Sequence, residues 1–222
     1  IALRPVLQEQ IEKWLATGTI RKCKVNTSFN SPLLLVPKKN KDGEIVSHRV
    51  CLDVRMLNKI LPPTFNYPVP LIKDIFAKLA GKKVFTTLDL TNAYHRFAVA
   101  ESDQHKLTFT HLDGQQYCFK KACFGLKFLT SQFSKVLAIL FDGLDCVQNF
   151  VDDAVIASDS LEQHIKDVRL VIERLNGANL ILNTGKCSWA QQSVRLLGFI
   201  VDSKGTRVDK SKLTNVHTFR KA

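Results

Sequence analysis

The chain has 222 residues, enough for one large domain or two small ones with a substantial core. Hydrophobic residues make up 45% and charged residues 23%, a balance that excludes a disordered chain. No apolar run approaches the roughly 20 residues that span a bilayer, and the first ten residues lack the layout of a signal peptide. We therefore expect no membrane partner.

The net charge is informative about the partner. Lys and Arg give a formal charge of +12, which favours a polyanion such as nucleic acid, although a basic enzyme without such a partner is the alternative. The six cysteines are scattered without a CxxC pair, which argues against a zinc module. Reduced thiols are typical of intracellular proteins, so we predict an intracellular location.

The first elements are a helix and a basic hairpin. Residues 6–16 carry apolar side chains at helical spacing, and Gly18 can close that helix. Residues 31–39 and 48–59 are expected to be two strands of a β-hairpin around Asp42 and Gly43. Its basic side chains are Lys38, Lys39, Lys41 and Arg49.

The prolines of PPTFNYPVP exclude a regular helix or a central strand at residues 62–70. A second helix is expected to start at Leu71 and to end at Gly81.

The rest of the chain alternates strands and helices. Residues 82–90 form a β-branched strand with Asp89 near its end, and Cys146–Ser158 reads as two short strands meeting at Asp152 and Asp153. Further strands are expected at 96–100 and 106–111, a strand and turn at 195–205, and helices at 129–141 and 159–177. The last helix has a capping pattern at Asp159 and Glu162 and an apolar stripe at Leu161, Ile165, Val168, Ile172 and Leu175. This order predicts an α+β fold, with helices packed on an antiparallel sheet.

Adjacent aspartates in the apolar run NFVDDAV need an explanation. Burying paired carboxylates is costly, because each raises the cost of ionising the other. Magnesium ions offset that cost, since they take a few carboxylate ligands together with substrate phosphates. Asp89 supplies a third carboxylate if its strand is a neighbour. On residue types alone, a hairpin turn at Asp152–Asp153 with Asp89 as a strand-end cap is an equally good interpretation.

Several motifs together resemble one enzyme family. LDLTNAYH and FVDD resemble two catalytic motifs of reverse transcriptases, and FGLK resembles a further palm motif. VPKK and HRVCLDVRMLNK resemble the fingers, and RLLGFIVDSKG resembles the segment beside the primer grip. The segment YPVPLIKDIFAKLAGKKVFTTLDL is similar to the gypsy-type form found in LTR retrotransposons and retroviruses. Each motif is weak alone, but together, in the family's order along nearly the whole chain, they are a strong signal.

The resemblance implies a polymerase right-hand fold, with an antiparallel palm sheet packed with helices and a fingers subdomain. It assigns residues 1–82 mainly to fingers with the start of the palm, and 83–203 to palm with further fingers strands at about 103–121. Residues 204–222 would begin the thumb or connection. The implied activity is RNA-directed DNA polymerisation, on an RNA or DNA template with a DNA primer. Thumb, connection and RNase H regions would lie elsewhere on a polyprotein in the cytoplasm or in virus-like particles.

The resemblance also assigns roles to residues. Asp89, Asp152 and Asp153 would bind two Mg²⁺ ions, for which Mn²⁺ is a possible substitute. Tyr94 matches the steric gate that selects dNTPs over rNTPs, although an ordinary strand aromatic is the alternative. The remaining matches are Lys39 and Arg49 at the triphosphate, Phe124 and Gly125 near the nascent base pair, and Lys186 as proton donor to pyrophosphate. For Lys186, a surface lysine after a turn is the simpler interpretation.

The chain departs from the family pattern after Lys127. Phe128, Leu129 and Thr130 stand where the gypsy-type pattern has Asn-Ala-Pro, in a region expected under the nucleotide. This change motivates an alternative, a catalytically impaired or repurposed nucleic-acid-binding module derived from such an enzyme. A structural or assembly protein that reuses the fold and an unrelated two-metal nuclease are further alternatives.

Overall fold

The computed structural model describes residues 3–40, 43–62, 67–68, 70–91, 93–150 and 153–209. The chain divides into two compact units, one of residues 1–65 and 92–129 (unit 1) and one of residues 66–91 and 130–222 (unit 2). The chain therefore leaves unit 1, enters unit 2 and returns before it completes unit 2. Asp152 and Lys41, both singled out from the sequence, lie outside the described residues.

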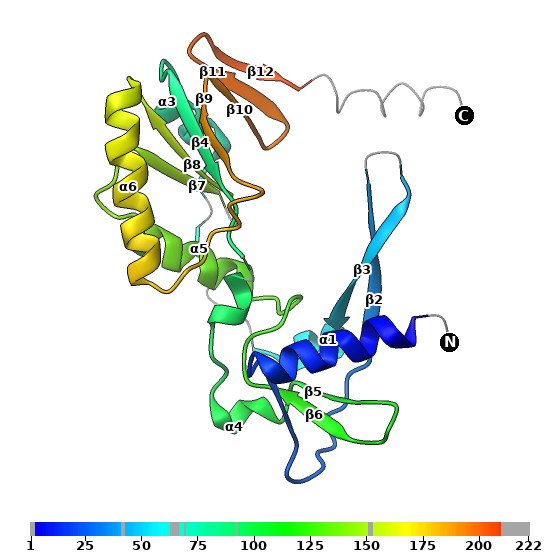
Figure 1. The fold of residues 1–222 in the computed structure, drawn as a ribbon. Coiled ribbons are helices and arrows are strands. Elements are labelled where there is room, and N and C mark those ends of the chain that lie inside the picture. Colours follow the sequence, from blue (N-terminus) through cyan, green and yellow to red (C-terminus); the bar gives the residue numbers. More distant parts are fainter. Residues whose placement is uncertain are drawn as a thin grey trace. The chain divides into compact units, whose positions relative to one another are not determined.

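Unit 1 combines a small sheet, a long hairpin and short helices (Figure 1). Strand order in the sheet is β1-β6-β5, and β2 pairs antiparallel with β3, from Leu33 opposite Leu52 to Lys39 opposite Ile45. Its helical elements are α1 (Arg4–Ala16), α2 (Arg55–Ile60), η1 (Ala93–Arg96) and α4 (Glu101–Gln104). Its strands are β1 (Ile20–Lys22), β2 (Leu33–Lys39), β3 (Ile45–Leu52), β5 (Thr108–Thr110) and β6 (Gln116–Phe119).

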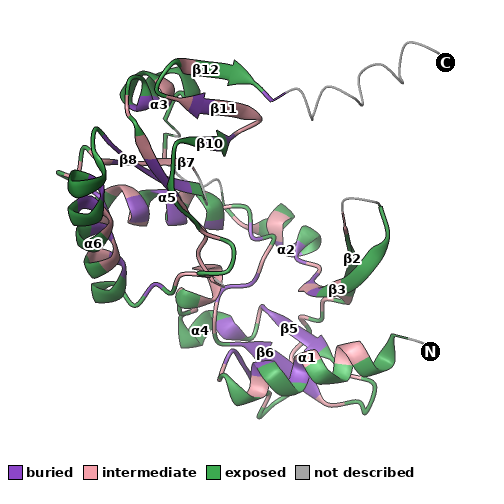
Figure 2. Cartoon of the chain, turned by 45° about the horizontal axis from the view of Figure 1, so that its top comes forward, coloured by how far each residue is buried: buried purple, intermediate pink, exposed green. Residues whose placement is uncertain are grey.

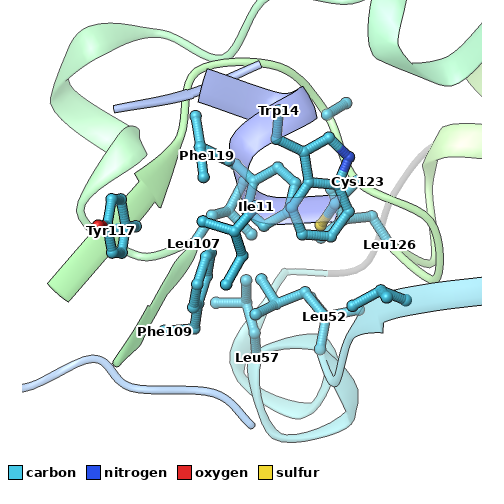
Figure 3. Close-up of a cluster of buried hydrophobic side chains, with 14 of the residues drawn as sticks. Ile11, Trp14, Leu52, Leu57, Leu107, Phe109, Tyr117, Phe119, Cys123 and Leu126 are labelled. Atoms are coloured by element: carbon cyan, nitrogen blue, oxygen red, sulfur yellow. The ribbon is translucent and has the colours of Figure 1, made fainter. Parts of the chain in front are cut away.

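A cluster of buried aliphatic and aromatic side chains forms the core of unit 1 (Figure 3). Trp14 of α1 makes edge contacts with Phe119 at 5.0 Å and Phe109 at 6.4 Å between ring centroids. Ile11 lies one helical turn from Trp14 and is also buried, as the sequence periodicity predicts. The expected helix is thus confirmed, and its apolar stripe joins α1 to the sheet.

Unit 2 is built on a four-stranded antiparallel sheet in the order β7-β8-β4-β9. Its strands are β4 (Val84–Leu88), β7 (Val147–Phe150), β8 (Asp153–Ser158) and β9 (Ser188–Gln191). A second sheet contains β10 (Ser193–Leu196), β11 (Phe199–Asp202) and β12 (Gly205–Val208). The helices are α3 (Ile72–Leu79), α5 (Leu129–Leu140) and α6 (Leu161–Gly177), of which α6 packs on β8 and β4 (Figure 1). Leu129, the first residue of α5, belongs to unit 1.

The two faces of the four-stranded sheet in unit 2 pack against different elements. Phe85 of β4 and Val155 and Ala157 of β8 pack with α3 and the second sheet. Thr86, the next residue of β4, instead meets α6. Side chains alternate along a strand, so residues 85, 87 and 89 share the α3 face, as do residues 153, 155 and 157. The expected α+β layout of helices on an antiparallel sheet is confirmed.

Three local expectations were wrong. The strand expected to continue to Lys59 ends at Leu52, because Asp53 accepts the backbone N–H of Arg55 and pairs with its guanidinium, which favours a turn into α2. The strand expected at 96–100 is reduced to an isolated bridge at Ala98 and follows the 3₁₀ turn η1. The strand expected within 195–205 is interrupted at Leu197, whose φ of 52° starts a turn between β10 and β11, whereas the turn expected at its end is present at residues 203–204.

The last helix also differs from its sequence pattern. Ser160, rather than Asp159, caps α6 by accepting the N–H of Gln163. In the predicted apolar stripe Leu161 is 56% exposed and Ile165 55%, while the buried positions of α6 include His164. Figure 2 shows α6 buried along one side and exposed along the other. The buried side of α6 carries polar groups, so the hydrophobic periodicity of the sequence did not reveal it.

Candidate active site

Two of the predicted acidic residues lie at neighbouring strand ends in unit 2. Asp89 directly follows β4, and Asp153 is the first residue of β8. These strands pair with Leu88 opposite Ala154, so one further step of the same register sets Asp89 opposite Asp153. By the alternation of side chains both project from the α3 face. Asp89 is half-buried and Asp153 is exposed, which suits carboxylates that share a site open to solvent.

These carboxylates fit a divalent metal in part. Oxygen donors are the ligands that Mg²⁺ prefers, and opposed strand ends bring two of them together. In the described part of the chain no group of three His, Cys, Asp or Glu side chains gathers as a metal site. The third predicted ligand, Asp152, lies outside the described residues, so the two described acids are the part of the ligand set that the fold assembles.

The backbone of Asp89 is held by a turn that the sequence did not single out. Its carbonyl accepts the N–H of Asn183 at 2.8 Å, and its own N–H points to the Sγ of Cys187 at 3.4 Å. Lys186 lies in the same turn, where its N–H donates to the Asn183 carbonyl, and its side chain is exposed. Lys186, the predicted proton donor, therefore lies in the turn that holds the backbone of Asp89, a predicted metal ligand. A lysine on the surface of a turn remains the simpler interpretation.

In unit 1 three predicted residues form a cluster, because Arg49 and Tyr94 both contact the ring of Phe124. The guanidinium carbon of Arg49, on β3, lies 5.4 Å from the ring centroid of Phe124, which is within reach of a cation–π contact. Tyr94, in η1, meets the same ring edge-on at 5.2 Å. Lys39 lies apart from this cluster on β2, three residues beyond Val36, the strand partner of Arg49. Both basic side chains are exposed, so both can reach an anionic ligand.

Gly125 needs to be glycine for two reasons. Its φ is +95°, a conformation that other residues adopt only with strain. A Cβ at this position would also lie 3.1 Å from Cγ2 of Val54. Any larger residue here would therefore be strained and would press on Val54, while the place of Gly125 near the nascent base pair stays a prediction.

Asn58 of α2 holds this turn in place. Its Nδ2 donates to the Gly125 carbonyl at 2.7 Å, and its Oδ1 accepts the N–H of Lys127 at 3.0 Å. Because the side-chain amide of Asn58 both donates and accepts, it fixes the backbone on both sides of Leu126. Asn58 was not singled out from the sequence, because its role depends on a contact across 67 positions of the chain.

His95 is a second residue that the sequence did not single out. Its Nδ1 donates to the Ala122 carbonyl at 2.9 Å, and its ring meets Phe124 edge-on at 5.5 Å. Burial lowers the pKa of His95 below its usual value, a shift that its hydrogen bond to the Ala122 carbonyl opposes and the nearby charge of Lys121 reinforces. A neutral imidazole therefore supports the Phe124 ring from the side.

Comparison with known proteins identifies the family. The model of the family described as reverse transcriptase (RNA-dependent DNA polymerase) matches residues 36–201, well over half of the chain. The chain belongs to the reverse transcriptase family. It is 35% identical over 215 residues to the retrovirus-related Pol polyprotein from transposon opus of Drosophila melanogaster, covering 96% of this chain and 21% of that polyprotein. It is 34% identical over 201 residues to the transposon Tf2-3 polyprotein of Schizosaccharomyces pombe, covering 90% and 14%.

Solved reverse transcriptases share the fold. A foamy viral protease-reverse transcriptase in complex with double-stranded DNA has a TM-score of 0.85 at 23% identity, covering 96% of this chain and 36% of that one. The foamy viral enzyme in complex with an RNA/DNA hybrid has a TM-score of 0.83 at 24% identity, covering 97% and 28%. The right-hand fold expected from the motifs is therefore confirmed. The division into fingers, palm and thumb stays a prediction.

The departure after Lys127 has a structural explanation. Leu129 is only 2% exposed and joins the core of unit 1, against which Phe128 is packed. Thr130 is exposed, and its carbonyl accepts the hydroxyl of Ser134 within α5. In this member of the family the changed segment thus contributes apolar side chains to a core, rather than leaving bulky groups on the surface.

Among the described residues, no helix is long and apolar enough to cross a membrane. All six cysteines are free thiols, as the sequence predicted.

Proposed function

We propose that this chain is the polymerising region of a retrotransposon reverse transcriptase. The observation that supports the proposal is the register of β4 and β8, whose last pair is Leu88 opposite Ala154, so that the adjoining residues Asp89 and Asp153 lie at neighbouring strand ends. The chain spans 21% of the opus polyprotein and 14% of the Tf2-3 polyprotein, so further regions such as thumb, connection and RNase H belong to the proposal as well. The gypsy-type assignment and a location in the cytoplasm or in virus-like particles are proposed on the same resemblance.

The proposed reaction joins a primer 3′-oxygen to the α-phosphorus of a dNTP. A new P–O bond forms as the bond to pyrophosphate breaks; the 3′-hydroxyl gives its proton to water, and pyrophosphate leaves. Bound divalent ions, Mg²⁺ or Mn²⁺, would stabilise the negative charge on the attacking and leaving oxygens. Asp89, Asp152 and Asp153 would hold these ions, and Lys186 would give a proton to pyrophosphate.

The chain's other predicted residues would bind and select the nucleotide. Arg49 suits a phosphate because its guanidinium binds two oxygens at once, while Lys39 supplies a point charge. Tyr94 would exclude the 2′-hydroxyl with its ring, which rests edge-on against Phe124. Phe124 and Gly125 would pack near the new base pair. The net charge of +12 suits a template–primer duplex of RNA or DNA template with DNA primer.

Primer extension tests the proposal. The wild-type chain should extend a DNA primer on an RNA template with dNTPs and Mg²⁺, and Asp89→Asn or Asp152→Asn should abolish extension without weakening template–primer binding. Asp145→Asn is the matched control, because this exposed carboxylate precedes β7 and has no predicted role. Equal duplex binding by all variants with no extension by any of them would favour the nucleic-acid-binding module, which the altered segment at Phe128–Thr130 motivates.

A further inference from the structure

A buried polar network lies on the α6 face of the unit 2 sheet, behind the face that carries Asp89 and Asp153. We call Thr86, Ser158, His164 and Asp167, with the N–H of Ala190, the back-face network. Thr86 is 0% exposed, Ser158 and His164 are each 2% exposed, and Asp167 is 9% exposed. Burying so many polar groups is costly unless every one is hydrogen-bonded.

The hydrogen bonds of this network run in one direction. Ser158 Oγ donates to Asp167 Oδ2 at 2.6 Å, because a carboxylate can only accept. Its single hydrogen is then used, so Ser158 Oγ accepts from Nδ1 of His164 at 2.9 Å. The other ring nitrogen, Nε2, lies 2.7 Å from Thr86 Oγ1, which in turn accepts the N–H of Ala190 at 3.0 Å.

This direction assigns the state of His164. A neutral ring with its hydrogen on Nδ1 leaves Nε2 as an acceptor for the Thr86 hydroxyl, so each group in the network has a partner. A charged ring would place a second hydrogen on Nε2, toward Thr86, and the Thr86 hydroxyl would lose its acceptor. Burial lowers the pKa of His164, against the opposing effect of Asp167.

The charged groups around the ring do not change this assignment. From β4 and β8 the ring meets two uncharged hydroxyl groups, and β9 supplies a backbone N–H to one of them. From α6 it meets Asp167, and Arg169 and Glu173 line the same surface groove as His164. Arg169 and Glu173 carry opposite charges, so they largely offset one another.

The network joins the strands that carry the acids. Thr86 lies three residues before Asp89 on β4, and Ser158 lies five residues after Asp153 on β8. His164 contacts both strands with its two ring nitrogens, and Thr86 fixes the neighbouring strand β9 through Ala190. A single side chain of α6 is thus hydrogen-bonded to both β4 and β8 from behind, while the ends of these two paired strands carry the acids on the other face.

We propose that His164 and Thr86 are positioning residues for the metal-binding carboxylates, acting through the strands rather than by contact. This inference rests on the proposed function, because it takes Asp89 and Asp153 as metal ligands. It adds a requirement that the neutral, Nδ1-protonated form of His164 be present for tight metal binding. Removing a group that orients metal ligands commonly weakens metal binding, so an effect at this distance is measurable.

Mn²⁺ binding measured by electron paramagnetic resonance tests the proposal without activity. Thr86→Val removes the hydroxyl and keeps the shape, and should weaken Mn²⁺ binding by less than the roughly 10- to 100-fold loss typical of removing a group bonded directly to a metal ligand. Thr86→Ser keeps the hydroxyl and is the matched control, expected to bind Mn²⁺ like the wild type. His164→Asn can keep a donor for Ser158 but has no atom at the Nε2 position to accept from Thr86, so it should behave as Thr86→Val does. It replaces Thr86→Val in the test if that variant does not fold.

Two results would overturn the proposal. One is wild-type Mn²⁺ affinity in folded Thr86→Val and His164→Asn chains whose melting temperatures have fallen, which would make the network a stabilising core feature only. The other is an NMR signature of His164 with its hydrogen on Nε2. A wild-type chain that binds Mn²⁺ through Asp89 but extends no primer would contradict the proposed function and leave this inference standing.

Discussion

Gly125 shows how one residue shapes the candidate site. Its positive φ and the 3.1 Å approach to Val54 are separate constraints, and Gly114 offers a way to separate them. Gly114 has a φ of +82°, and nothing lies within 4 Å of the place that a Cβ would take, so a substitution there meets only backbone strain. The Phe124 ring, which carries the contacts with Arg49 and Tyr94, directly precedes Gly125.

We predict that Gly114→Ala lowers the free energy of unfolding by about 1–2 kcal/mol, the cost of a left-handed conformation with a Cβ. Gly125→Ala should cost more, since its Cβ also contacts Val54, and Val54→Ala should recover part of the loss when combined with it. Urea titration of the three variants measures these values. Equal losses at the two glycines would show that the contact with Val54 has no energetic weight.

At the scale of elements, most of what the sequence predicts well is local. The helix at α1, the hairpin β2–β3 and the strand ends at Asp89 and Asp153 follow from periodicity, turn residues and motifs. Two of the features that were missed depend on contacts far apart in the chain, namely Asn58 on the Gly125 turn and Cys187 beside Asp89. The strand break at Leu197 is a local change of backbone conformation.

The helix α6 illustrates why the rest could not be predicted. Its buried face includes His164 and Asp167, which a hydrophobic pattern treats as solvent-exposed positions. Their burial is tolerated only because Ser158 and Thr86, on two strands, supply matching partners. The spacing of residues within α6 does not show these partners. The hydrophobic pattern therefore placed Leu161 and Ile165 on the buried face, whereas the structure exposes them.

The docking of α6 should depend on pH. The folded chain keeps His164 neutral, with its pKa lowered from 6.5 by burial, while the unfolded chain takes up a proton near 6.5. The stability is therefore fully present above pH 6.5 and falls as the pH drops below it, by up to about 1.4 kcal/mol per pH unit. The lowered pKa of His95 acts with the same sign.

Urea titrations at about pH 7.5 and about pH 5.5 measure this effect, in a range where histidines titrate and ordinary carboxylates largely do not. The wild type should be less stable at the lower pH, and His164→Asn should show a smaller difference between the two conditions. An equal difference in both proteins would mean that His164 takes up its proton without disturbing the back-face network.

For the molecule as a whole, the excess of positive charge should govern nucleic-acid affinity. Neutralising phosphates releases counterions, so the affinity for a template–primer duplex should fall steeply with salt. The proposed role of Lys39 is different, because it would contact the dNTP rather than the duplex. Charge on the whole surface and charge at the nucleotide can therefore be separated by experiment.

We predict that Lys39→Ala raises the KM for dNTP roughly tenfold, the loss expected for one charge-assisted contact, while the slope of duplex affinity against salt stays at its wild-type value. Lys38→Ala is the matched control, since the neighbouring lysine of β2 is also exposed but has no predicted role at the nucleotide. Steady-state primer extension gives the KM, and fluorescence anisotropy across a salt series gives the slope. A slope that falls by about one in Lys39→Ala with an unchanged KM would reassign this side chain to a duplex phosphate, because each phosphate contact contributes about one to the slope.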